Sequence, residues 1–305
     1  MTNPAPGAEP LAFDAAPDWA VAPGAPSMTQ AAGTLLREIG IVDEHGARRT
    51  IHIPVERPLT VFVDKRELVT LMTLGASPEL LVLGYLHNQR LIARLDDVEA
   101  VSVDWEVNAA AVKTRRGVAD LADRTAQRVV TTGCGQGTVF GQVMDGLDAV
   151  RLPDARQARI RQSTLNGLLE VMRQRNSVHR KAGSVHGCAL FRGTEMLIFA
   201  EDVGRHNAID TIAGWMLMHG VTGEDKVFYT TGRLTSEMVM KAAQMRIPIV
   251  VSRNGVTAMG HDLASRLGMT LFGRAANRHF LCYTGVERFD SEPEPERPAV
   301  RVVAG

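Results

Sequence analysis

Hydrophobic and polar positions in the first part of the chain follow the spacing of short strands. Apolar runs and alternating residues predict strands at 50–53, 59–63, 67–73, 98–107 and 128–132. Between them, residues 78–91 carry leucines at helical spacing and begin with Pro78 and Glu79, which suit the first turn of a helix. This part of the chain is therefore predicted to form a small α+β lobe.

The second part alternates strands with helices. Short apolar runs predict strands at 188–191, 196–199, 226–230, 247–252, 269–272 and 280–284. Apolar residues near helical spacing predict helices at 155–176, 208–219, 236–245 and 260–267. This alternation implies right-handed crossovers and a mostly parallel sheet with helices on both faces. The predicted fold class is α/β, with the α+β lobe in front of it.

The two ends of the chain show no such periodicity. Residues 1–27 contain six prolines among many alanines, and residues 287–305 are acidic and rich in proline. These compositions predict a disordered leader and a mobile tail. Between them we expect an N-terminal lobe at 28–135, ending in the loop of Cys134, and a core domain at 136–286.

Composition narrows the function classes. The 305 residues include 34 basic and 34 acidic ones, so the overall charge favours neither nucleic acid nor an anionic membrane. We find no apolar run long enough to span a bilayer and no secretory signal, which predicts a cytoplasmic protein. The three cysteines are scattered, which argues against a disulfide scaffold or a cysteine-rich zinc site.

Cys134 stands in the glycine-rich stretch Gly133-Cys134-Gly135-Gln136-Gly137. A dinucleotide-binding loop would need a helix directly afterwards and an acidic residue about 20 positions on, and neither is evident. The flanking glycines suit an exposed thiol that a partner can approach, although an inert cysteine at a turn fits as well. Cys188 and Cys282 lie inside apolar strands, where small core residues are expected.

Polar residues follow three consecutive predicted strands of the second part. In parallel strands such ends converge on one rim of the sheet, where α/β proteins bind ligands. Arginines and helix amino termini at this rim favour an anion with several phosphates, whereas a solvated loop is the simpler alternative. The candidate binding residues there are Glu201, Asp202, Arg205, His206, Arg233 and Arg253.

The chain resembles the formate dehydrogenase accessory sulfurtransferase family, FdhD/NarQ. The resemblance rests on Val185-His186, Glu201 to Ala208, Thr231-Gly232-Arg233, Ser236-Glu237-Met238-Val239, Lys241, Ile247-Pro248, Ser252-Arg253 and the stretch from Thr270-Leu271 to Tyr283-Thr284, and more loosely on Glu56 to Leu86. It implies a sheet like that of cytidine deaminases without their zinc ligands, a homodimer, and a role in maturing molybdenum or tungsten enzymes of the formate dehydrogenase type.

The resemblance also implies a site. By motif position, Cys134 accepts sulfur from a cysteine desulfurase as a persulfide and passes it to the molybdenum bis(molybdopterin guanine dinucleotide) cofactor, which GDP-like nucleotides would mimic. No structural metal is expected. Glu201 and Asp202 would either accept hydrogen bonds from a guanine or order the arginines. The cofactor-binding segment of the family falls on Arg274, Ala275, Ala276, Asn277, Arg278 and His279.

Departures from the family pattern leave alternatives. Typical members have Cys-x-x-Cys in the loop, whereas Gly137 stands at the second cysteine position here. One thiolate is sufficient to carry a persulfide, but a resolving thiol is lost. The alternative is a chaperone that binds the molybdenum cofactor without transferring sulfur. A nucleoside hydrolase or deaminase would need a metal-bound water, whose ligands the scattered cysteines do not supply.

Overall fold

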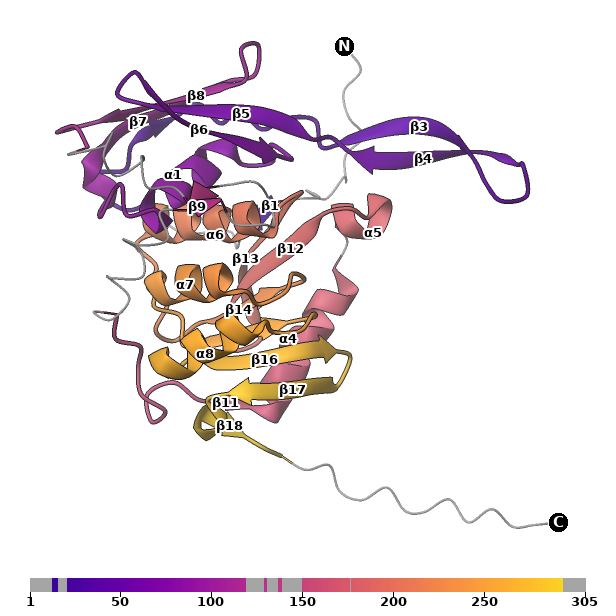
Figure 1. Cartoon of the computed structure of the whole chain (residues 1–305), viewed down its shortest axis with the longest axis vertical. Helices are drawn as coiled ribbons and strands as arrows, with labels where there is room; N and C mark the ends of the chain where they lie inside the picture. The colour runs from indigo at the N-terminus through magenta and orange to yellow at the C-terminus, as the bar shows by residue number, and fades with distance from the viewer. Residues whose placement is uncertain are drawn as a thin grey trace.

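Two sheets, with helices between and around them, form the body of the molecule (Figure 1). The computed structural model describes residues 21–118, 150–175 and 177–292, together with the backbone of three short strands, β1 (Phe13–Ala15), β9 (Val129–Val130) and β10 (Gly137–Thr138). Within these ranges no helix is long and apolar enough to cross a membrane.

The N-terminal lobe is a five-stranded sheet in the order β2-β7-β8-β5-β6. Its elements are β2 (Ser27–Met28), β5 (Arg57–Val63), β6 (Arg66–Thr73), α1 (Pro78–Asn88), the short 3-10 helix η1 (Leu95–Asp97), β7 (Val98–Asp104) and β8 (Ala109–Thr114). Inward-facing residues such as Leu59 and Val61 pack on Leu83 and Leu86 of α1. A hairpin of β3 (Leu36–Val42) and β4 (Arg48–Pro54) projects from this lobe (Figure 1).

The second sheet has seven strands in the order β1-β13-β12-β14-β15-β16-β17. Their bounds are β12 (His186–Arg192), β13 (Glu195–Asp202), β14 (Val227–Thr230), β15 (Ile249–Ser252), β16 (Thr270–Ala276) and β17 (His279–Thr284). Only β14–β15 and β15–β16 pair in parallel, so the expectation of a mostly parallel sheet is wrong. Two-residue loops at Gly193-Thr194 and Asn277-Arg278 force the antiparallel pairs β12–β13 and β16–β17.

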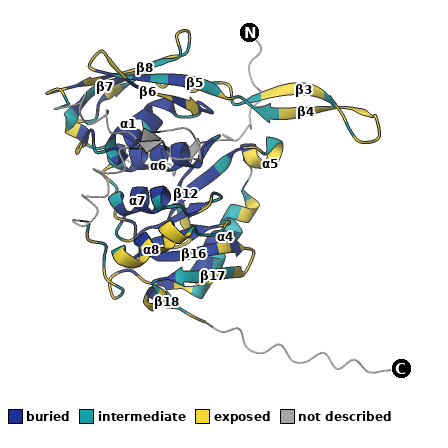
Figure 2. Cartoon of the chain, in the orientation of Figure 1, coloured by how far each residue is buried: buried dark blue, intermediate teal, exposed yellow. Residues whose placement is uncertain are grey.

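Helices cover both faces of this sheet, as predicted. The helices α6 (Arg205–His219), α7 (Ser236–Gln244) and α8 (Ala258–Leu267) share one core with Leu190 and Phe228. The opposite face, with Phe191 and Phe199, packs on α4 (Gln162–Gln174). Figure 2 shows α1 and α6, which lie between the two sheets, as almost fully buried.

The two lobes meet where α1 crosses α6. A Cβ atom on Gly84 would lie 1.7 Å from the carbonyl oxygen of Asp210, and one on Gly214 would lie 2.0 Å from that of Leu80. Contact this close between two backbones requires glycine at both positions. Because Trp215 of α6 belongs to the core of the second sheet and Met218 to the core of the first, α6 serves both lobes.

Several boundaries differ from the predicted ones. The helix expected over 155–176 begins only at Gln162, because Asp154 Oδ1 accepts hydrogen bonds from two following amides and holds a turn. The strand expected over 98–107 ends at Asp104, whose carboxylate closes a turn by accepting from the amide of Glu106. The strands β3 and β8 and the helix α5 (Val178–Ala182) were not anticipated.

Two end segments expected to lack structure contribute strands. Within the leader 1–27, β1 pairs with β13 at the edge of the seven-stranded sheet. Within the tail 287–305, β18 (Phe289–Asp290) follows the 3-10 helix η2 (Val286–Arg288) and pairs with β11 (Ile160–Arg161). Phe289 stacks edge-on against Phe272 and Phe280 in the core, which holds this part of the tail on the sheet.

Candidate functional site

The polar strand ends converge on one rim of the seven-stranded sheet, as the sequence predicted. Ser252 at the end of β15 is the register partner of Thr230 at the end of β14. Because β12 is antiparallel to its neighbours, its first residue, His186, stands at the same rim opposite Asp202. The loops that follow β13, β14, β15 and β16 therefore surround one place on the molecule.

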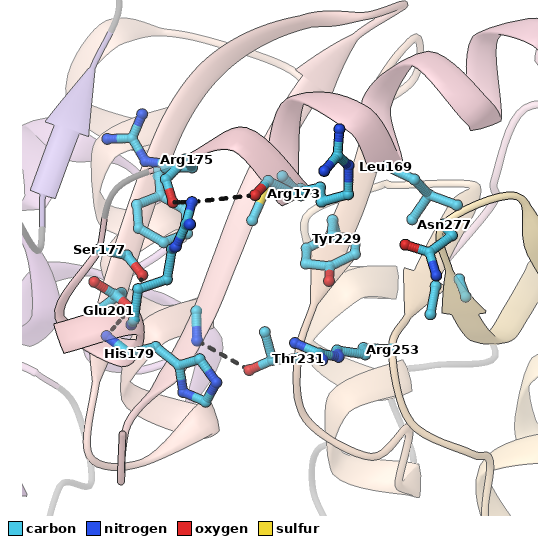
Figure 3. A pocket seen from close by; sticks show the side chains of 16 residues that line it. Leu169, Arg173, Arg175, Ser177, His179, Glu201, Tyr229, Thr231, Arg253 and Asn277 are labelled. Atoms are coloured by element: carbon cyan, nitrogen blue, oxygen red, sulfur yellow. Dashed lines mark hydrogen bonds between the residues drawn. The ribbon is translucent and has the colours of Figure 1, made fainter. Parts of the chain in front are cut away.

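A cavity of about 340 Å³ opens at this rim (Figure 3). We call it the rim pocket. Its walls come from the carboxyl end of α4, from α5, from the ends of β13 to β15 and from the β16–β17 hairpin. Apolar residues form one part of the wall, and they are Leu169, Met172, Gly187, Phe199, Ala275 and Ala276. Polar groups form the rest, and they are Arg173, Arg175, Ser177, His179, Arg180, Glu201, Tyr229, Thr231, Arg253 and Asn277.

Four of these residues are arginines, and Arg173 pairs with Glu170 of the same helix. The guanidinium of Arg175 is stacked over the Phe199 ring at 4.5 Å and covers that face of the ring. Arg180 donates to the carbonyl oxygens of Arg173 and Arg175 and caps the end of α4. Arg253 is exposed and forms no ion pair with any described residue. The pocket is therefore electropositive and suits an anion with a flat, partly apolar group.

Among the described residues of the pocket wall, Glu201 is the single acidic one, and its carboxylate is engaged within the protein. Its Oε2 accepts from the amide of Val178 at 2.7 Å, and its Oε1 accepts from the amide of His179 at 3.0 Å. Burial raises its pKa, against the lowering effect of these hydrogen bonds. Of the two roles left open by the sequence, this geometry favours ordering of the arginine-bearing segment 175–180 over recognition of a guanine.

Hydroxyl and amide groups complete the pocket. Figure 3 shows the phenol oxygen of Tyr229 directed toward Arg253 and Thr231. Burial raises the pKa of Tyr229 to about 12, so the phenol remains a hydrogen-bond donor at neutral pH. Asn277 has a left-handed backbone, with a φ of 56°, at the tip of the β16–β17 hairpin. These groups add hydrogen-bonding capacity without adding negative charge.

The structure brings some of the predicted residues together and separates others. Glu201, Arg253, Ala275, Ala276 and Asn277 line the rim pocket. Arg278 lines a neighbouring cavity. The exposed residues Arg233, Arg274 and His279 line neither cavity, and Asp202, Arg205 and His206 are buried behind the rim.

Asp202 serves as an internal anchor. Its Oδ2 accepts from the hydroxyl of Thr73 at 2.5 Å and from the amide of Leu74, and its Oδ1 accepts from Asn207 Nδ2 at 2.8 Å. Burial raises its pKa to about 6, although these donors oppose the rise. The carboxylate thereby fixes the end of β6, in the N-terminal lobe, to the start of α6.

His206 belongs to a buried polar network on the helix side of the sheet. Burial, with Lys241 and Arg205 nearby, lowers its pKa to about 2, so its contact of 3.3 Å with Glu237 is made by a neutral imidazole and is not an ion pair. Lys241 Nζ donates to Asp210 Oδ2 at 2.7 Å and lies 3.8 Å from Glu237. Asp210 of α6 is thus paired inside the protein with Lys241 of α7.

Two of the three cysteines lie within the described residues, and they differ in burial. Cys134 lies outside the described residues, so its assignment as the persulfide site remains a prediction. Cys188 is fully buried, its thiol donates to Thr230 Oγ1, and burial raises its pKa to about 12. Cys282 packs at the edge of the core of α4, and burial raises its pKa as well. Cys188 is a core residue, as expected, whereas Cys282 is only partly buried and packs against the core.

Several residues of the rim pocket were missed in the sequence. Arg173, Arg175 and His179 belong to the end of α4 and to α5, far from the predicted strand ends. The feature of the sequence that could have indicated them is the cluster of basic residues over 173–181, shortly before β12. Tyr229 was hidden inside an apolar strand, where nothing distinguishes it from a core residue.

Comparisons with known proteins show which family the chain resembles over most of its length. The profile of the FdhD/NarQ family matches residues 54–290. The chain is 29% identical over 236 residues to "Sulfur carrier protein FdhD" of Geobacillus kaustophilus, covering 77% of this chain and 89% of that one. It is also 29% identical over 251 residues to the protein of the same name from Halalkalibacterium halodurans, covering 82% and 93%.

A solved structure shares the fold. The crystal structure of a putative formate dehydrogenase accessory protein from Desulfotalea psychrophila superposes with a TM-score of 0.66 at 23% identity, over 84% of this chain and 98% of that one. The family match spans both lobes and every residue of the rim pocket. This chain therefore belongs to the FdhD/NarQ family.

Proposed function

We propose that this protein is a cytoplasmic, homodimeric sulfur carrier that matures a molybdenum or tungsten enzyme of the formate dehydrogenase type. It would hold the bis(molybdopterin guanine dinucleotide) cofactor by its nucleotide ends and supply sulfur to the metal. The names of the relatives, sulfur carrier protein and formate dehydrogenase accessory protein, support this role. Light scattering of the purified chain tests the dimer.

The observation that carries the cofactor assignment is the rim pocket. The planar guanidinium of Arg175, stacked on Phe199, suits the face of a purine, and Arg253 with Arg173 suits its phosphates. The carboxylate of Glu201 is already engaged by two backbone amides, so it adds little repulsion toward an anion. The pocket lies at the carboxyl ends of the parallel strands, where α/β sheets bind nucleotides.

The sulfur step would use Cys134. Its thiolate attacks the outer sulfur of the persulfide on a cysteine desulfurase, an S–S bond forms on Cys134, and the cysteine thiolate of the desulfurase leaves. No net oxidation occurs in this exchange. Delivery of that sulfur to the metal as sulfide requires two electrons, which a thiol reductant would supply. The buried, high-pKa Cys188 is unsuited to this role.

Mass spectrometry of the intact protein tests the sulfur step. After incubation with a cysteine desulfurase and cysteine, the native chain should gain the mass of one sulfur, and Cys134→Ala should gain none. Cys282→Ala is the matched control and should load like the native chain. If the native chain gains no sulfur although it binds GDP, the chaperone alternative replaces the carrier.

Titration calorimetry with GDP tests the pocket. Arg253→Ala should weaken binding by about 10-fold, equivalent to about 1.4 kcal/mol. Arg233→Ala is a close control, because Arg233 follows the neighbouring strand and is also exposed, but does not line the pocket. Equal losses in the two variants would show that general positive charge, and not this pocket, attracts the nucleotide.

A further inference from the structure

The β3–β4 hairpin projects from the N-terminal lobe as a ribbon of only two strands (Figure 1). Its base is anchored by Leu35 and Leu36, which pack against the small core around Leu74 and Val178. The helix α5 also lies against β4. Because an isolated two-stranded ribbon is at best marginally stable in water, the outer part of this hairpin calls for a surface to pack on.

One face of the hairpin is apolar. In an antiparallel pair, residues opposite each other point to the same face, and successive residues of a strand alternate between faces. The register pairs Ile39 with Ile51, Arg37 with Ile53 and Ile41 with Arg49. These six residues therefore share one side, which we call the isoleucine face, with four isoleucines between two arginines at diagonal corners. The opposite face carries Glu38, Gly40, Val42, Arg48, Thr50 and His52.

The isoleucine face packs into no core of the described part of the chain. None of its four isoleucines belongs to a hydrophobic core there, neither as a buried member nor as a partly buried neighbour. Ile51 is 41% exposed, whereas Leu59 on the following strand is completely buried. A contiguous apolar face on an ordered, projecting element is typical of a contact with another protein.

The charges around this face fit a second copy of the same hairpin. Arg49 Nε lies 2.7 Å from Asp43 Oδ2, so the charge at this corner is compensated within the hairpin. Arg37, at the corner near the base, forms no ion pair with any described residue. At the tip, the side chain of Glu44 is 81% exposed. One hairpin therefore offers a cation at its base and a carboxylate at its tip.

We infer that two copies of this chain pair through their isoleucine faces, with the base of each hairpin beside the tip of the other. A two-fold axis across the strands at the Ile39–Ile51 pair produces this arrangement, since an interface of that symmetry uses one patch twice. The isoleucines of the two copies then cover one another, and each Arg37 lies beside the partner's Glu44. This inference rests on the proposed function and deepens it, because it locates the contact within the homodimer.

Sedimentation velocity of the full chain over a series of concentrations tests the inference. Two seven-residue strands present a face of about 24 by 10 Å, far below the ~800 Å² that a stable interface buries on each partner, so dissociation should be measurable. Ile51→Glu should raise the dissociation constant at least about 100-fold, because a carboxylate would be buried at the centre of the interface. Val42→Glu is the matched control and should dimerise like the native chain, since Val42 lies on the opposite face and is 64% exposed.

A charge exchange tests the orientation of the two hairpins. Arg37→Glu should weaken the dimer by about 10-fold, because it places a carboxylate beside the partner's Glu44 in two symmetric contacts. The double variant Arg37→Glu/Glu44→Arg should restore the native dissociation constant. Both positions are exposed, so these substitutions do not threaten the fold. A double variant as weak as Arg37→Glu would overturn the base-to-tip arrangement.

The outcomes separate this inference from the proposed function. A dimer that Ile51→Glu leaves intact, or that Val42→Glu weakens equally, would overturn the inference and leave the homodimer standing. A native chain that stays monomeric at every concentration would overturn both and leave the isoleucine face to another protein or to a segment outside the described ranges. The sulfur step is tested separately, by the mass of the loaded chain.

Discussion

Removal of Lys241 should damage this fold more than removal of its partner Asp210. Lys241 is 3% exposed and Asp210 is completely buried, and the two form an ion pair at 2.7 Å. Lys241 also lies 3.8 Å from Glu237, so one cation serves two buried carboxylates. In Lys241→Met, the carboxylates of Asp210 and Glu237 both lose their cation. In Asp210→Asn, Lys241 still has the carboxylate of Glu237 beside it.

The burial of these groups sets how much more stability Lys241→Met loses than Asp210→Asn. Breaking a buried pair by deleting one partner destabilises by about 3–5 kcal/mol, because a charge remains buried without compensation. We expect this loss for Lys241→Met, since burial already raises the pKa of Asp210 even with the lysine present. Asp210→Asn removes one charge-assisted hydrogen bond and keeps an acceptor for Asn88 Nδ2, for a loss of about 1.5–3 kcal/mol.

Urea unfolding followed by circular dichroism near neutral pH measures these losses. The double variant Lys241→Met/Asp210→Asn completes a double-mutant cycle. It should be more stable than Lys241→Met alone, because it no longer has a buried Asp210 carboxylate without a cation. An interaction energy of about 2 kcal/mol is expected between the two sites. Losses that simply add, or a double variant weaker than both single ones, would refute the pairing.

Three further changes probe other parts of the molecule. Glu201→Gln should weaken the hydrogen bonds to the amides of Val178 and His179, speed their hydrogen exchange and weaken GDP binding by about 10-fold; unchanged protection of both amides would contradict the ordering role of Glu201. His206 has its pKa lowered from 6.5 to about 2, so the unfolded chain binds a proton below pH 6.5 that the folded chain rejects. Stability should therefore fall with decreasing pH by up to about 1.4 kcal/mol per unit, and His206→Gln should show a shallower slope in urea titrations than the native chain. Gly84→Ala should lower stability by about 3 kcal/mol in thermal melts, whereas Gly167→Ala, whose new methyl meets only the end of the Thr194 side chain, should be nearly neutral, and similar losses in both would contradict the backbone contact.

Local patterns predicted much of this molecule. Apolar runs such as Ile249 to Val251 are short and fully buried, so strand length and composition were sufficient to locate them. The polar ends of these strands do meet at one rim, because β14 and β15 run in parallel and stand in register. Connection lengths also carried information that was overlooked, since the two-residue loop before Glu195 requires an antiparallel neighbour.

Other features depend on contacts that the sequence pattern does not contain. Asp202 and His206 look like solvated loop residues, yet both are buried. Asp202 binds Thr73 of the N-terminal lobe, 129 positions away, and His206 lies against Glu237 of α7. The basic wall of the rim pocket comes from α4, which reaches the rim only because it packs across the opposite face of the sheet. Such residues can be recognised as parts of one site only when the packing of the helices on the sheet is known.

The glycine crossing of α1 and α6 also limits how this protein can move. Packed helices usually accommodate shear by small rotations of the side chains between them, and here no side chains intervene between Gly84 and Gly214. The close contact between the backbones of α1 and α6 therefore resists sliding of one lobe past the other. Rearrangements of the molecule are therefore expected in the loops and hairpins outside the crossing of α1 and α6.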